Sequence, residues 1–188
     1  MTARWVVDIA SERDLDIVWE PISLLMKNNT SPDSEYYAPV LWTTKLMRVM
    51  ESVRCAEGNA AVHELYFEYG RRIHHDKERL FDATLALESA GLPVKHAEAA
   101  EDDTWDEVIR SAMDEGLALV GQDVGTPIIA YTAADGRVVA NFGPVITRVP
   151  KGDDKLRLWD AFVTLTELDG FWELKRTRTE RPEFGERP

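Results

Sequence analysis

The sequence predicts an α/β protein in which a long helical segment separates two parts that contain strands. Three observations support this fold class. The chain begins with an amphipathic helical pattern followed by a β-rich run, residues 32–121 keep a helical periodicity, and two β-rich runs joined by a hairpin loop follow. A chain of 188 residues is long enough to bury one sizeable core. We expect one globular protein organised as segments 1–31, 32–121 and 122–188.

Residues 1–31 are expected to form a helix and a strand. Apolar residues recur at helical spacing over residues 2–13, which indicates an amphipathic helix. Residues 15–22 are rich in β-branched and aromatic types and end at Pro21, as is typical of a strand near a sheet edge. A helix that leads into a buried strand normally crosses over from a preceding parallel strand. We therefore expect a first strand upstream of Met1, or one supplied by a neighbouring chain.

The middle segment, residues 32–121, is expected to be an inserted helical domain. Four apolar stripes follow one another at helical spacing, over residues 42–56, 62–73, 80–87 and 108–119. Gly58 ends the first stripe, and Thr104 with Glu107 has the pattern of a capping box before the last.

The last segment, residues 122–188, returns to strand patterns. Two β-rich runs at 128–132 and 137–142 are joined by Ala-Ala-Asp-Gly, a good hairpin loop. A final helix is expected from Asp153 or Asp154, with Trp159 on its apolar face. The tail beyond residue 175 has little apolar content.

Composition excludes several function classes. With 22 basic and 34 acidic residues the formal net charge is −12, which opposes phosphate binding, so we expect no nucleic-acid partner. No apolar run approaches the length that crosses a bilayer, and the first residues do not resemble a signal peptide, so we expect a cytoplasmic protein without a membrane partner. The single cysteine, Cys55, cannot form an intrachain disulfide or a thiolate metal cluster. We expect Cys55 to be unpaired and without function.

Six longer strings carry a resemblance to a known family. They are RWVVDIASERDLDI at 4–17, RRIH at 71–74, DVGTPII at 123–129, NFGPVITRVPKG at 141–152, LWDAFVTL at 158–165 and FWELKRTRTERPEF at 171–184. Together they resemble the actinobacterial mycothiol-dependent nitroreductase and DsbA-like family. The resemblance implies a thioredoxin-like fold of the DsbA type with a large helical insertion. It also implies reduction of disulfides or of small nitro-aromatic or quinone-like compounds, with mycothiol or another low-molecular-weight thiol as co-substrate and no tightly bound cofactor.

The sequence departs from that family where the chemistry would lie. The family carries a Cys-Pro-x-Cys or related motif at the amino end of the first helix, where the helix dipole lowers the pKa of a thiol. Here that helix begins at Met1-Thr2, so we expect the catalytic cysteines upstream of Met1 and none in this chain. Two alternatives stay open. One is a thiol-free ligand-binding thioredoxin-fold protein. The other is an enzyme like the kappa-class transferases and 2-hydroxychromene-2-carboxylate isomerases, which activate a bound thiol with a hydroxyl group, for which Thr2 is the nearest residue.

Gly125, Thr126 and Pro127 are the first candidate binding residues. Thioredoxin-fold proteins place a cis-proline at the entrance to this strand, so the resemblance implies a cis bond before Pro127. It also implies that Thr126 presents its backbone groups to an incoming disulfide or thiol, in a groove between the sheet and the helical insert. The alternative is a trans proline that begins an edge strand.

Asn28 and His74 are the other candidates, because they match polar positions that face the substrate pocket in the related reductases. The alternatives are a turn residue for Asn28 and a helix-end imidazole that satisfies the last carbonyls for His74. His74 and His75 do not predict a metal site, since adjacent helical residues point in directions too different to share one ion. The expected partners are thus a low-molecular-weight thiol and a small-molecule or disulfide substrate, and a homodimer is compatible with the sequence.

Overall fold

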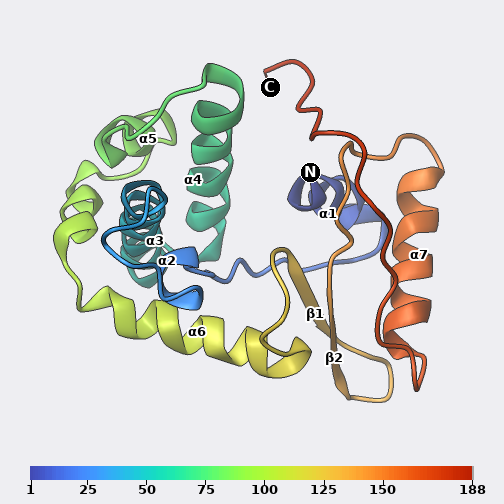
Figure 1. Ribbon diagram of the computed structural model, residues 1–188. Helices are drawn as coiled ribbons and strands as arrows, with labels where there is room; N and C mark the ends of the chain where they lie inside the picture. Colours follow the sequence, from blue (N-terminus) through green and yellow to red (C-terminus); the bar gives the residue numbers. More distant parts are fainter. Residues whose placement is uncertain (188) are drawn as a thin grey trace. The chain divides into compact units, whose positions relative to one another are not determined.

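The computed structural model describes residues 1–187, which divide into two compact units (Figure 1). The strand unit consists of Met1–Ile17 and Gly116–Gly185. The helical unit consists of Val18–Glu115 together with Glu186 and Arg187. Residues 1–187 are mostly helical and contain one two-stranded sheet, so the predicted mixed α/β class is confirmed.

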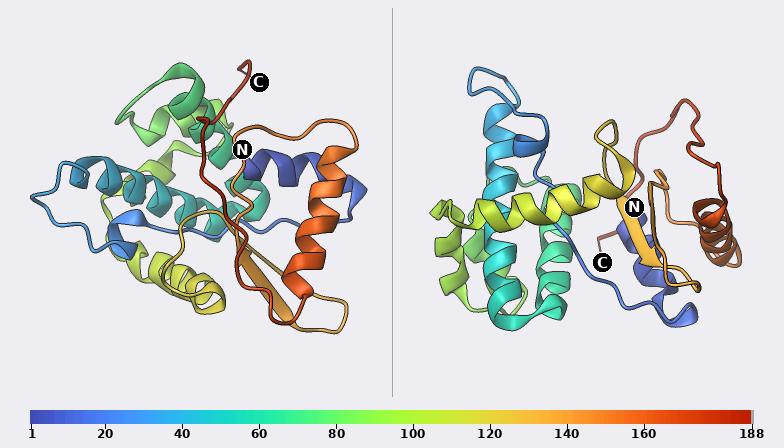
Figure 2. Two further views of the ribbon diagram at one scale, coloured as in Figure 1. Left: turned by 45° about the vertical axis from the view of Figure 1, so that its right-hand side comes forward. Right: turned by 90° about the horizontal axis from the view of Figure 1, so that it is seen from below.

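The strand unit contains α1 (Thr2–Ile9), β1 (Ile128–Thr132), β2 (Val138–Phe142) and α7 (Asp154–Glu167). The two strands form the predicted antiparallel hairpin, in register from Ile128 opposite Phe142 to Thr132 opposite Val138. Helix α7 packs on both α1 and β2, and Figure 2 shows the same grouping from two further sides. The core is aromatic and is made of Trp5, Ile9, Trp159 and Phe162.

The predicted strand at residues 15–22 is absent, so this prediction is wrong. These residues have no regular secondary structure and pair with no other strand, and the sheet within residues 1–187 consists of β1 and β2. At Trp19 the backbone hydrogen bonds go to side chains of helices instead. Its N–H donates to Asn59 Oδ1 at 3.1 Å, and its carbonyl accepts from the Arg54 guanidinium. A β-rich composition makes a strand only where a partner edge is present.

The helical unit packs its helices around one apolar core. Its elements are α2 (Leu24–Lys27), α3 (Tyr37–Glu57), α4 (Asn59–Arg71), a π-helical turn (Arg72–Asp76), α5 (Ala83–Ser89), a 3-10 helix (Val94–Glu101) and the first part of α6 (Trp105–Val120). The buried core side chains are Leu46, Val49, Val53, Val62, Leu65, Tyr69, Ala83, Ala86 and Leu87. These residues confirm the predicted stripes, since most of them lie on those helical faces.

Two predicted helix starts differ from the structure. The stripe at 80–87 begins to be helical at Ala83, because Asp82 caps that helix by accepting from the Thr84 N–H at 2.8 Å. The Thr104 hydroxyl donates to Asp102 Oδ1 at 2.7 Å, so it is used in the turn before α6 rather than in a capping box. In both places a nearby Asp side chain accepts a hydrogen bond from a threonine, from the Thr84 N–H or from the Thr104 hydroxyl, and so changes the predicted helix start. No helix within residues 1–187 is long and apolar enough to cross a membrane.

Tyr131 of β1 makes the stability of the strand unit depend on pH in alkaline solution. Its hydroxyl donates to Glu167 Oε1 at 3.2 Å, and burial, with the negative charge of Glu167, raises the pKa of Tyr131 from 10.0 to about 12. The unfolded phenol therefore loses its proton first as the pH rises. We expect the contribution of Tyr131 to the free energy of unfolding to be present below pH 10.0 and to be lost between pH 10.0 and about 12. Burial also raises the pKa of Tyr66 and Tyr69, so tyrosinate absorbance titration should show several late-titrating phenols, and the one that titrates near pH 12 should disappear in Tyr131→Phe.

Candidate functional site

Two proline turns lie at one end of the hairpin in the strand unit. The bond between Thr126 and Pro127 is cis, as predicted, and a second cis bond joins Gly143 to Pro144. The Gly143 N–H donates to the Pro127 carbonyl at 2.8 Å, which ties the two turns together. Gly143 has φ +102, and a Cβ there would lie 3.2 Å from the Val145 nitrogen, so this turn requires glycine. The second turn was not predicted, although its Gly-Pro pair lies within the string at 141–152.

The first turn of α1 is bound to the second of these turns. The buried Thr2 side chain donates from Oγ1 to the Pro144 carbonyl at 2.7 Å. Three segments that are far apart in the sequence therefore meet within the strand unit. Since the Thr2 hydroxyl already donates to a backbone carbonyl, it is poorly placed to activate a bound thiol.

Thr126 is exposed at this meeting point, between half-buried Gly125 and Pro127. Its backbone N–H and C=O take part in no hydrogen bond with other residues of the described chain, because the β1–β2 ladder begins at Ile128. A free N–H beside a free C=O can pair with an extended peptide-like group, as one more strand would. The turn therefore offers a backbone docking point.

Asn28 lies in a pocket of the helical unit, directly after α2. The pocket has a volume of about 480 Å³ and is lined by Leu24, Asn28, Asn29, Thr30, Ser31, Ser34, Tyr36 and Val40. Asn28 is exposed and caps the carboxyl end of α2 through its backbone N–H. Asn29 has φ +45, a conformation that Asn tolerates better than most residues. The turn directs two amide side chains to one place.

Ser23 and Thr44 hold α2 and thereby the pocket. The Thr44 hydroxyl donates to the Val40 carbonyl at 2.8 Å, so in their mutual 2.8 Å bond Ser23 is the donor. Ser23 Oγ also accepts from the Met26 N–H at 3.3 Å as the helix N-cap. Both side chains are fully buried.

Ser23→Ala is expected to lower the free energy of unfolding by about 1–2 kcal/mol, because a cap and a buried hydrogen bond are lost together. Urea unfolding followed by circular dichroism measures this change. Ser11→Ala, an exposed serine in the strand unit, serves as the control and should change stability by less than about 0.5 kcal/mol. Equal midpoints for the two variants would contradict the role given to Ser23.

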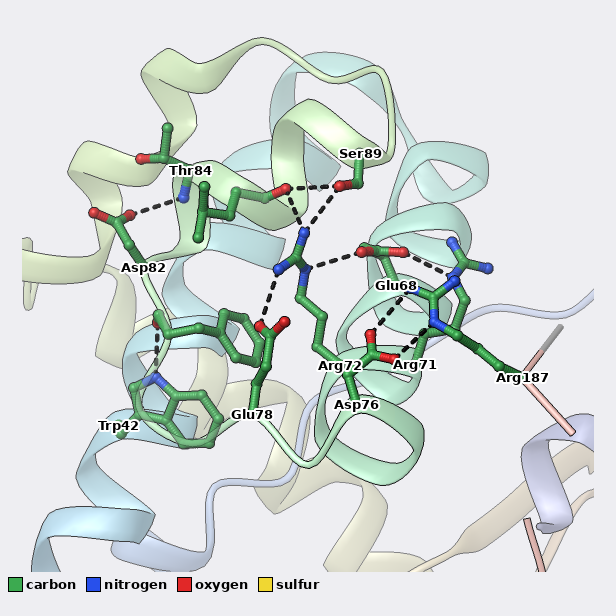
Figure 3. Close-up of polar contacts among 12 residues, drawn as sticks. Trp42, Glu68, Arg71, Arg72, Asp76, Glu78, Asp82, Thr84, Ser89 and Arg187 are labelled. Atoms are coloured by element: carbon green, nitrogen blue, oxygen red, sulfur yellow. Dashed lines mark hydrogen bonds and ion pairs between the residues drawn. The ribbon is translucent and has the colours of Figure 1, made fainter. Parts of the chain in front are cut away.

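His74 lies in the π-helical turn and is exposed. It does not line the pocket that contains Asn28, and its backbone carbonyl accepts from Lys77 Nζ. Its neighbour Arg72 holds this turn in place (Figure 3). The guanidinium of Arg72 binds Glu68 and Glu78 at 2.9 Å each and also donates to the Leu85 carbonyl and Ser89 Oγ. Among residues 1–187 no group of three acidic, His or Cys side chains could hold a metal ion.

The comparison with protein-family models decides the family. The model described as "Rv2466c-like: Mycothiol-dependent nitroreductase Rv2466c" matches residues 1–176. The chain belongs to this family. The match spans both units and all five candidate residues, and it confirms the resemblance found in the sequence. Members of a mycothiol-dependent nitroreductase family are oxidoreductases that use a thiol. Membership therefore indicates an oxidoreductase function with mycothiol as the thiol partner.

Cys55 alone does not supply the two thiols that a dithiol mechanism requires. It lies exposed on α3 in the helical unit, and it is the one cysteine of the sequence. A dithiol mechanism needs a second thiol to resolve the mixed disulfide.

Proposed function

We propose that this chain forms the substrate-binding and thiol-binding part of a cytoplasmic mycothiol-dependent reductase. Its substrates are disulfides or small nitro-aromatic or quinone-like compounds. Two mycothiol thiols are oxidised to one disulfide and release two electrons and two protons. With a nitro compound these convert the nitro group to a nitroso group and water; with a quinone they give the hydroquinone.

The observation that carries this proposal is the exposed Thr126 backbone beside Pro127. Its free N–H and C=O match the amide of a cysteinyl thiol, which can add to them as a short extended strand. Such pairing would orient the sulfur, and correct orientation supplies much of the rate of a thiol exchange step. The membership in a mycothiol-dependent family supports the choice of thiol.

We further propose that the redox-active cysteines belong to a segment upstream of Met1 that docks at the amino end of α1. That end has no side-chain cap and no acidic residue in its first turn, so its N–H groups are available to stabilise a thiolate. The same segment would supply the strand that completes a thioredoxin-like sheet of the DsbA type, with the helical unit as its insertion. Asn28 and the pocket around it would then bind the small molecule.

The test is to express the protein with the in-frame codons upstream of Met1 and to follow mycothiol-dependent loss of a nitroarene. We expect turnover by the extended protein, loss of turnover when its first upstream cysteine becomes serine, and no effect of Cys55→Ser. Turnover by residues 1–188 alone, or an extended protein without thiol-dependent activity, would overturn the proposal.

A further inference from the structure

The aromatic core of the strand unit contains two tryptophans and one tyrosine in a continuous row. The Trp5 and Trp159 rings lie 6.0 Å apart between centroids, and the Trp159 and Tyr131 rings lie 6.2 Å apart. Both separations lie within the roughly 4.5–7 Å of interacting aromatic pairs. We infer that this row carries a one-electron oxidation from Trp5 through Trp159 to Tyr131. The carboxylate of Glu167 accepts the phenolic proton where the row ends.

The members of the row are the side chains that this chemistry requires. Indole and phenol rings give up a single electron to strong oxidants, whereas the ring of phenylalanine does not. Phe162 contacts Trp159 at 5.9 Å and Tyr131 at 6.3 Å between centroids, so it packs beside the row without joining it. Trp159 contacts both other members and is therefore the obligatory middle step.

The proton acceptors give the row a direction. Trp5 Nε1 donates to the Lys155 backbone carbonyl at 2.8 Å, and a neutral carbonyl is too weak a base to take the proton. The Tyr131 hydroxyl lies 3.2 Å from Glu167 Oε1 and 3.4 Å from the Val163 carbonyl, so the carboxylate is the nearer acceptor. An oxidised phenol is a strong acid, and its proton moves to that carboxylate. The product is a neutral tyrosyl radical, at which the oxidation stops.

Burial agrees with these roles. Trp5 is fully buried and Trp159 is 8% exposed, so water is kept from the two intermediate radicals. Tyr131 and Glu167 are half-buried, so a reductant in solution can reach the end of the row. Burial, with the charge of Glu167, raises the pKa of Tyr131 to about 12, so the phenol still holds its proton at neutral pH.

The helical unit contains a similar pair without the proton acceptor. Trp19 and Tyr66 are stacked at 4.9 Å between centroids, which is closer than either step of the row. The Tyr66 hydroxyl has no hydrogen-bond partner within residues 1–187. This pair therefore provides an internal comparison in which ring contact is present and the base is missing.

The source of the oxidation rests on the proposed function, because Trp5 belongs to α1, where the thiol chemistry is proposed. A peroxyl radical formed there takes one electron from Trp5 and, with a proton from water, becomes a hydroperoxide. Trp159 and then Tyr131 replace that electron, and the phenolic proton passes to Glu167. A thiolate in solution returns one electron to Tyr131 and becomes a thiyl radical, while Glu167 returns the proton. The oxidation is thereby moved away from α1.

The test fixes a photo-oxidant on α1 of the 188-residue chain. A ruthenium tris-bipyridine label is attached to Asp8→Cys, at an exposed position of α1, in a Cys55→Ser background. After a flash with an external quencher, we expect the absorption of a tyrosyl radical. Trp159→Phe, which keeps an aromatic ring, and Tyr131→Phe should each abolish this signal. Glu167→Gln should slow its appearance about tenfold or more, since a positioned base contributes roughly 10²–10⁴-fold to proton transfer.

Trp172→Phe and Tyr66→Phe are the controls and should leave the signal unchanged, because Trp172 is 87% exposed and Tyr66 belongs to the other unit. An undiminished signal in Trp159→Phe or in Tyr131→Phe would overturn the inference. Glu167→Gln changes a half-buried side chain near the end of α7 and decides the case if Trp159→Phe does not fold.

The outcomes also separate this inference from the proposed function, since the flash experiment contains neither mycothiol nor a nitroarene. If the tyrosyl radical does not form while the extended protein reduces a nitroarene with mycothiol, the inference is wrong and the reductase proposal stands. If the radical forms as expected and the extended protein has no thiol-dependent activity, the row stands and the proposed function fails.

Discussion

Trp5→Ala is expected to lower the free energy of unfolding of the strand unit by about 3–5 kcal/mol. The Trp5 side chain is fully buried, and its ring lies 6.0 Å from that of Trp159 between ring centroids. Its Nε1 donates to the Lys155 carbonyl at 2.8 Å. The substitution therefore opens a large cavity and also removes a side-chain hydrogen bond between α1 and α7. Since typical domains are stable by about 5–15 kcal/mol, this variant should lie near the limit of folding.

Urea unfolding, followed by near-ultraviolet circular dichroism, measures this effect. Trp172→Ala is the matched control, because the Trp172 side chain is 87% exposed and its removal should change stability by less than about 0.5 kcal/mol. If Trp5→Ala and Trp172→Ala unfold at the same urea concentration, the aromatic core is not what stabilises the strand unit.

Glu68→Ala is expected to destabilise the helical unit by about 3 kcal/mol. The Glu68 side chain is 4% exposed and accepts from Arg71 Nε at 2.7 Å and from Arg72 Nε at 2.9 Å (Figure 3). Its removal takes one carboxylate from the mostly buried Arg72 guanidinium, which then retains Glu78 alone as an acidic partner. The expected loss lies at the low end of the roughly 3–5 kcal/mol for a broken buried ion pair. The reason is that Arg71 is partly exposed to solvent.

The control for this prediction lies on the same helix. Glu64 is exposed on α4, so Glu64→Ala should alter stability by less than about 0.5 kcal/mol while removing the same charge. Thermal unfolding of both variants separates a specific buried contact from a change in net charge. Similar losses in the two variants would show that charge, rather than the contact with Arg72, determines the result.

Much of the fold follows from local sequence patterns. The apolar stripes predicted the helices correctly because the same helical faces pack in the core. The Asp-Gly loop likewise predicted the hairpin of β1 and β2. The expected strand at 15–22 failed because its composition says nothing about a partner edge, and Trp19 is bound by helix side chains instead. Strand pairing is a long-range property that one sequence window does not contain.

The candidate site was predictable in part. The resemblance pointed to Pro127 and Asn28, but the gathering of Thr30 and Tyr36 beside Asn28 depends on the turns after α2. The spacing of Glu68 and Arg72 is a visible i, i+4 ion-pair pattern. The other partners of Arg72 come from residues 78–89, which are brought close by the loop between α4 and α5 and have no spacing signal.

The most direct measurement of the central claim is the stoichiometry of the reaction catalysed by the extended protein. We expect one mycothiol disulfide to form for each nitro group reduced to the nitroso level, with no turnover when mycothiol is left out. Loss of the nitro group without matching formation of mycothiol disulfide would contradict the assignment of this chain to a mycothiol-dependent reductase.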